Sequence, residues 1–232
     1  MTNDARRFAG LYAAVAAALA VLLAPLLALS YFATTEGAEE LETGTVSLWA
    51  AQGRDLAGGL LTWASPERVY STYVQAFAVL FAGVFLCAVA VRRGREPGSG
   101  GERWGWRIAL TGYGLATAGL VGAFVALIPG DPANAALNVV FLALLLPGMF
   151  VSVIGSTVLG IAFVRSGYRP RATSWLLALA LPAMVVVPTL LGHNSLGMLP
   201  LMVAWGVTGA VLWRGGSTRP ELAGAALRRT AA

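Results

Sequence analysis

The sequence contains no lysine, one cysteine and one histidine. The lack of lysine excludes a retinal or pyridoxal Schiff base, because both need a lysine amine. The single Cys87 excludes an intrachain disulfide, a cysteine-cluster zinc site and an iron–sulfur cluster. The single His193 excludes haem held by two histidines of one chain. We therefore expect this chain to hold no metal and no cofactor.

Charge is also scarce. Only 12% of the 232 residues are charged, 57% are hydrophobic, and the mean hydropathy is +0.72. A soluble domain needs more charge than this to cover its surface. The composition therefore predicts an integral membrane protein whose surface is in contact with lipid.

Long apolar runs are abundant. A spanning helix needs about 20 mainly apolar residues, each adding about 1.5 Å along the helix axis. Six stretches meet or approach this length: residues 8–32, 70–91, 105–128, 135–164, 173–191 and 197–213. They predict an all-α, polytopic six-helix bundle in one domain over residues 1–232, with an outer loop at 33–69 and a tail at 214–232. Pro147, Pro182 and Pro188 are expected to disturb the fourth and fifth spans.

The arginines divide sharply between the two sides that these spans define. Fourteen of the 16 fall at the N-terminus, near the loops after the second and fourth spans, and in the tail, whereas the other side carries Arg54 and Arg68 among seven acidic residues. The positive-inside rule then predicts that both termini are cytoplasmic in a multi-pass protein of the cell membrane. Arginines facing anionic lipid headgroups explain the net charge of +5, so we expect no nucleic-acid partner.

The first span has an alternative interpretation. Arg6 and Arg7 precede the apolar run, as in a secretory signal peptide. The run is longer than the usual hydrophobic region of about 7–15 residues, which favours a retained span. Cleavage would leave the same orientation for the other five spans, so topology leaves this alternative open.

The outer loop contains an amphipathic segment. After an acidic run, Trp49, Leu56, Leu60 and Trp63 recur at helical spacing. This pattern predicts a bent helix that lies in the membrane interface. Two roles remain open for it: a lid or docking surface over an outer pocket, or a loop tucked against lipid.

Small residues recur every four positions in two spans. Such stripes let membrane helices approach closely, and we expect the third and fourth spans to form the tightest seam of the bundle. The expected packing residues are Gly114, Ala118 and Gly122 in the third span, and Gly148, Ser152, Ser156 and Gly160 in the fourth. The serines have a second interpretation, a polar path through the membrane.

Polar residues gather at the outer ends of the second, fourth and fifth spans. If these ends converge, the residues form an outward-facing ligand pocket made mainly of neutral hydrogen-bonding groups. The candidate pocket residues are Tyr73, Gln75, Asp131, Asn134, Asn138, His193 and Asn194. The alternative is helix capping at a wet interface, since Asp131 and Asn134 fall where N-caps belong.

The span cores contain no Asp, Glu, Lys, Arg or His. This argues against a proton relay, a voltage sensor or an intramembrane protease, which keep ionisable groups in the bilayer. The first hypothesis is a non-catalytic accessory or scaffold component, whose partners are the lipid bilayer and other membrane proteins or a second copy of the chain. The second is a carrier or binder of a neutral or lipid-like small molecule. The third is an interfacial lipid-modifying enzyme with His193 and Asp131 as acid and base.

Overall fold

The computed structural model describes residues 1–42, 44–126 and 134–215, with side chains described outside 123–142. Within these residues every regular element is a helix, so the all-α expectation is confirmed there. The elements are α1 (Asn3–Tyr31), η1 (Ala38–Glu42), α2 (Gly44–Leu61), α3 (Pro66–Arg93), α4 (Gly100–Ala126), α5 (Asn134–Ser166), α6 (Arg171–Ala178), α7 (Ala180–Leu191), α8 (Asn194–Gly197) and α9 (Leu199–Trp213).

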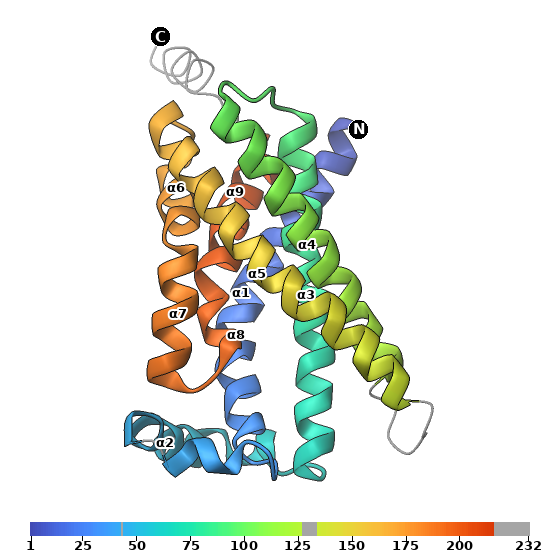
Figure 1. Cartoon of the computed structure of the whole chain (residues 1–232), viewed down its shortest axis with the longest axis vertical. Helices are drawn as coiled ribbons and strands as arrows, with labels where there is room; N and C mark the ends of the chain where they lie inside the picture. Colours follow the sequence, from blue (N-terminus) through green and yellow to red (C-terminus); the bar gives the residue numbers. More distant parts are fainter. Residues whose placement is uncertain (43, 127–133, 216–232) are drawn as a thin grey trace.

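Several helices are long and apolar enough to cross a membrane. They are α1, α3, the Ala143–Ser166 part of α5, and α8 with α9; the pair α6 and α7, bent by 60°, makes a fifth if it is one span. These helices are consistent with the predicted multi-pass membrane protein. Figure 1 shows the long helices running between two ends of the molecule, and α2 lies across one of these ends. We call that end the α2 end, and the end that carries the N-terminus the arginine end.

The break between α6 and α7 falls at Leu179, shortly before Pro182, one of the three prolines expected to disturb a span. The other two, Pro147 and Pro188, lie inside the continuous helices α5 and α7. Proline has no N–H, so the helical bond from residue 182 to the carbonyl of Ala178 is missing. The preceding N–H, that of Leu181, donates to Thr157 Oγ1 of α5 at 3.1 Å. A neighbouring helix therefore satisfies a backbone group at the bend, as lipid requires.

The helices α4 and α5 pack backbone to backbone along their length. A Cβ added at Gly112 would lie under 3.0 Å from the backbone nitrogen of Ser152, and one added at Gly148 or Gly155 would meet the α4 backbone equally closely. A Cβ added at Gly105 would lie 2.9 Å from the backbone nitrogen of Leu159 in α5, and one added at Gly119 would lie 2.7 Å from that of Leu145. The pair expected to form the tightest seam thus lies in close contact.

The α4 glycines in this seam differ from the expected stripe. The contacting glycines of α4 follow a seven-residue spacing, because about two helical turns return a residue to the same face of a helix. A four-residue stripe instead rotates off that face. A Cβ added at Gly114 would accordingly meet Phe85 of α3 at 3.9 Å, and one added at Gly122 would meet no described atom of another helix within 4 Å. Ala118 is exposed.

On α5, the two ends of the expected stripe have different neighbours. Gly148 and Ser152 lie in the seam with α4, whereas a Cβ at Gly160 would meet the α6 backbone at Ala178. The stripe therefore serves two partners in succession, α4 and then α6.

The alanine-rich α1 packs against α3 and α9 with its small residues and exposes a face of larger apolar residues. A Cβ at Gly10 would lie 2.6 Å from the carbonyl oxygen of Gly209, and one at Gly83 would lie 3.2 Å from the Ala16 Cβ. Small residues on α1 thus let α3 and α9 each pack closely against α1.

We expect Gly112→Ala to destabilise the protein by about 1–3 kcal/mol, because the added methyl group must displace the backbone at Ser152. Gly114→Ala, two residues away on the same helix, is the matched control. Its Cβ makes an ordinary contact, and both variants gain the same helix propensity of up to about 1 kcal/mol. Thermal unfolding in one detergent measures the difference, and equal shifts for the two variants would contradict the seam.

Candidate functional site

The helix α2 is fastened across one end of the bundle by polar and aromatic contacts. The Arg54 guanidinium donates to the carbonyl oxygen of Phe32 at the end of α1. The Tyr73 hydroxyl of α3 donates to the carbonyl oxygen of Leu60 at 2.8 Å. The ring of Trp49 meets that of Phe32 edge to face, with centroids 5.8 Å apart. Tyr73, expected in a ligand pocket, therefore anchors α2.

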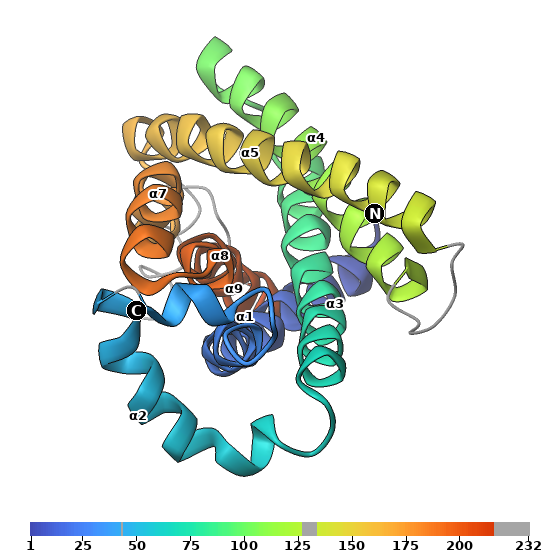
Figure 2. The same cartoon turned by 60° about the horizontal axis from the view of Figure 1, so that its bottom comes forward.

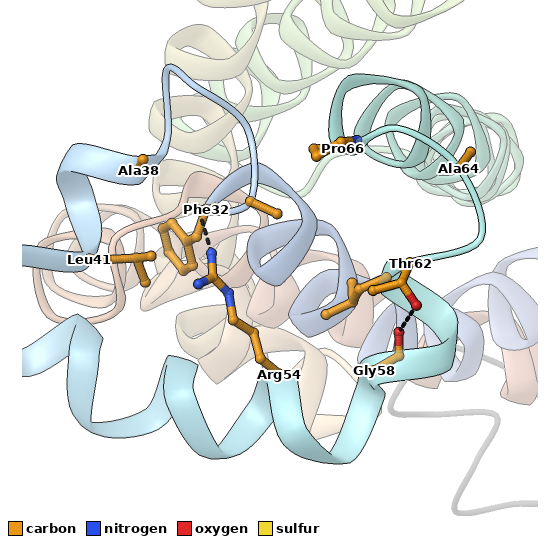
Figure 3. A pocket seen from close by; sticks show the side chains of 10 residues that line it. Phe32, Ala38, Leu41, Arg54, Gly58, Thr62, Ala64 and Pro66 are labelled. Carbon is orange, nitrogen blue, oxygen red and sulfur yellow. Dashed lines mark hydrogen bonds between the residues drawn. The ribbon is translucent and has the colours of Figure 1, made fainter.

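A cavity of about 560 Å³ lies between α2 and the ends of α1 and α3. Figure 3 shows Arg54 reaching across it toward Phe32, with Leu41 and Pro66 on its walls. We call it the α2 cavity. The guanidinium is the one charged group among its lining residues.

Behind the α2 cavity, four rings from three segments form an aromatic cluster. The ring centroid of His193 lies 5.1 Å from that of Tyr31, 6.4 Å from that of Tyr70 and 6.5 Å from that of Phe32. Tyr31 and Tyr70 are themselves 5.5 Å apart. The cluster joins the ends of α1 and α3 to the turn between α7 and α8.

His193 is held by the residue two positions after it. Its Nδ1 accepts from the backbone N–H of Ser195 at 3.2 Å and lies 2.8 Å from the Ser195 hydroxyl, which in turn lies 3.0 Å from the carbonyl oxygen of Ala24. An Nδ1 that accepts a hydrogen bond is unprotonated. Burial lowers the pKa of His193 from 6.5 to about 4, so the ring is neutral at physiological pH.

A second cavity, of about 230 Å³, opens beside this cluster and runs into the bundle. We call it the bundle cavity. Its walls are apolar side chains of α1, α3, α4 and α5 with Met198, which follows α8, and its polar lining residues are Tyr70, His193, Asn194 and Ser195. These polar residues lie together near the α2 end, whereas Phe81 and Met149 extend the cavity toward the middle of the bundle. None of the lining residues is an Asp, Glu or Arg.

The structure brings together part of the predicted pocket. His193 and Asn194 line the bundle cavity, and Tyr70 and Ser195 join them. Gln75 is half-buried and is not among the lining residues. Asn134 begins α5, Asn138 lies in its second turn, and the side chains of both fall outside the described part, as does all of Asp131.

A chain of hydrogen bonds lies one turn deeper than the bundle cavity. The Trp205 indole N–H donates to the Tyr113 hydroxyl at 2.9 Å, that hydroxyl lies 2.6 Å from Ser156 Oγ, and Ser156 donates to the carbonyl oxygen of Ser152. Because the Ser156 proton is used there, Tyr113 donates to Ser156. All four residues are buried. The expected serine stripe thus supplies a cross-link between α4, α5 and α9.

A buried carboxylate near the arginine end was missed from the sequence. Glu102 is fully buried and forms an ion pair with Arg95 at 2.7 Å; it also accepts from the backbone N–H of Gly98 at 3.0 Å. The Arg95 guanidinium lies over the stacked rings of Phe163 and Tyr168. The pair fixes the connection between α3 and α4 against the end of α5. Its signal was Glu102 seven residues after Arg95 in a segment assigned to a loop.

Comparison of the chain with protein-family models, with curated proteins and with solved structures found no match in any of the three. The case for function therefore depends on the geometry of the site. Among the described residues, no group of three His, Cys, Asp or Glu side chains lies close enough to hold a metal ion.

The lowered pKa of His193 predicts a pH dependence. Below pH 6.5 His193 is protonated in the unfolded chain, whereas in the folded chain it stays neutral down to about pH 4. The free energy of unfolding therefore falls as the pH falls from 6.5 to about 4. His193→Asn keeps an acceptor for the Ser195 N–H but does not titrate. We expect its melting temperature to fall less between pH 7 and pH 4 than that of the unaltered chain. Parallel pH profiles would contradict a buried, neutral His193.

Proposed function

We propose that this chain is a multi-pass membrane protein that binds a neutral, lipid-like small molecule in the bundle cavity. The observation that carries the proposal is a cavity with apolar walls whose polar groups gather at one end. Ligand sites are commonly concave, mainly apolar and provided with a few placed polar groups.

The dimensions favour a slender ligand. The cavity volume of about 230 Å³ lies just below the usual range of roughly 300–1,000 Å³ for small-molecule sites. One alkyl chain or a compact apolar molecule suits this space, and a whole phospholipid does not.

The polar lining favours a ligand without net charge. His193 is neutral at physiological pH, and Tyr70, Asn194 and Ser195 carry no charge. A charged headgroup brought here would find no opposite charge to offset its loss of water. A hydroxyl, amide or ester group finds donors and acceptors.

For the topology we propose six spans with both termini cytoplasmic. The proposal counts α6 with α7 and α8 with α9 as one span each, and it includes α4, which lies along α5 in both views (Figures 1 and 2). It is supported by the concentration of arginines at one end of these helices. The α2 end then faces outward, and the bundle cavity admits its ligand from the outer leaflet.

An accessory or scaffold role is a second proposal, and α2 is the observation that favours it. Leu56 is 90% exposed and Leu48 is 74% exposed on this helix. An apolar face of this kind suits the membrane interface or a partner protein. The enzyme hypothesis has less support, because the described residues give His193 hydrogen bonds only to Ser195, which is itself buried.

Val74→Phe tests the proposed ligand site by filling the bundle cavity from α3. We expect labelling of cavity-lining peptides by a photoactivatable fatty alcohol to fall about tenfold or more, a loss of about 1.4 kcal/mol in binding. Val79→Phe, the same change at a 47% exposed position of α3, should leave labelling unchanged. Mass spectrometry of the labelled peptides gives both values. Equal labelling of the two variants would contradict the site.

Cysteine labelling tests the topology without removing the native cysteine, because Cys87 is fully buried and should not react. We expect a membrane-impermeant maleimide to label Ser47→Cys on intact cells. It should label Glu96→Cys, between α3 and α4, only after lysis. Both positions are exposed in the structure. The reverse pattern would invert the orientation.

A further inference from the structure

A third cavity, of about 520 Å³, lies at the arginine end between the start of α1 and the end of α9. It is lined by Asn3, Asp4, Arg6, Arg7, Leu212 and Arg214, with Gly215. We call it the arginine cavity. It lies at the opposite end of the bundle from the proposed ligand site and shares no lining residue with it.

Two of the three arginines are positioned by the helix ends around them. Arg7 Nε donates to the carbonyl oxygen of Trp213, the last residue of α9, at 3.1 Å. The Arg6 guanidinium packs against Gly94 after α3, where an added Cβ would lie 3.3 Å from its Cζ. Arg6 Nε is buried and has no hydrogen-bond acceptor among the described residues.

The positive charge in this cavity is only partly offset. Asp4 is the one acidic residue in its lining. The ion pair Arg95–Glu102 is the only one that the described part of the chain forms, so neither Asp4 nor another described carboxylate pairs with Arg6, Arg7 or Arg214. Three guanidinium groups against one carboxylate leave a local excess of positive charge.

The position of the cavity relates this charge to the membrane. Trp213, whose carbonyl accepts from Arg7, is 44% exposed at the end of a spanning helix. Tryptophan at such a position marks the level of the lipid headgroups. Guanidinium groups recognise phosphate through paired N–H donors, and at this level the abundant phosphate is that of phospholipids.

We propose that the arginine cavity binds the phosphate group of an anionic phospholipid. Arg6 and Arg214 approach the phosphate from α1 and α9, and Arg7 completes the site while it stays bonded to α9. The bound lipid thereby ties the first and last helices of the bundle together. Asp4 disfavours ligands that carry several negative charges in one place.

The test is a titration of the detergent-purified full chain with phosphatidylglycerol, followed by native mass spectrometry. We expect the double variant Arg6→Gln, Arg214→Gln to lose about 25-fold in affinity, about fivefold for each arginine. The control is Arg103→Gln with Arg165→Gln, which removes the same charge from exposed arginines outside the cavity. Its affinity should stay within about twofold of the unaltered chain.

Other arms make the result decisive. The double variant Arg6→Lys, Arg214→Lys keeps the charge but loses the planar guanidinium donors, so we expect an affinity between those of the unaltered chain and the glutamine variant. This variant tests the site even if the glutamine variant misfolds. Equal losses in the two glutamine pairs would reduce the site to general surface attraction and overturn the proposal. Inorganic phosphate that binds as tightly as the lipid would assign the site to free phosphate instead. Val74→Phe should leave phosphatidylglycerol binding unchanged, which separates this site from the bundle cavity.

Discussion

The arrangement of this protein depends on close backbone contact between helices. Inside a bilayer the hydrophobic effect does not drive helices together, because lipid tails are as apolar as the side chains. Glycines at Gly112 and Gly155 bring α4 and α5 together, and Gly10 and Gly209 do the same for α1 and α9. A β-carbon at any of these positions would separate two helices. Small residues thus determine which helices pair and leave the larger side chains to fill what remains.

The bundle cavity lies toward the α2 end of the helices that these contacts hold together. In the half toward the arginine end, Gly160 lets α5 meet α6, and hydrogen bonds from Trp205 through Tyr113 tie α9 to α4 and α5. Toward the α2 end, α5 faces α3 and α8 with the large side chains Leu145 and Met149. The cavity lies between these side chains and the lining residues of α1, α3 and α8.

The sequence predicted what depends on composition and on local backbone chemistry. Apolar runs located the long helices, and of the three prolines expected to disturb a span only Pro182 lies by a bend, the one between α6 and α7. The sequence did not predict which face of α4 meets α5. Both the stripe that contains Gly114 and the seven-residue series that contains Gly112 lie on α4, and only the packing against α5 shows which of them forms the seam.

Polar residues were harder to place for a similar reason. A tyrosine at a helix end suits a pocket or an anchor equally well, and Tyr73 turned out to bond α2. Glu102 was assigned to a loop because charged neighbours lowered the local hydropathy, although its partner Arg95 allows it to be buried inside the fold. Below the bundle cavity, Trp205, Tyr113 and Ser156 each donate a proton within their own chain of hydrogen bonds. These three residues therefore offer no spare donor, and the polar residues that line the cavity lie beside His193. A ligand of the proposed kind would place its polar group toward the α2 end and its apolar part toward the middle of the bundle.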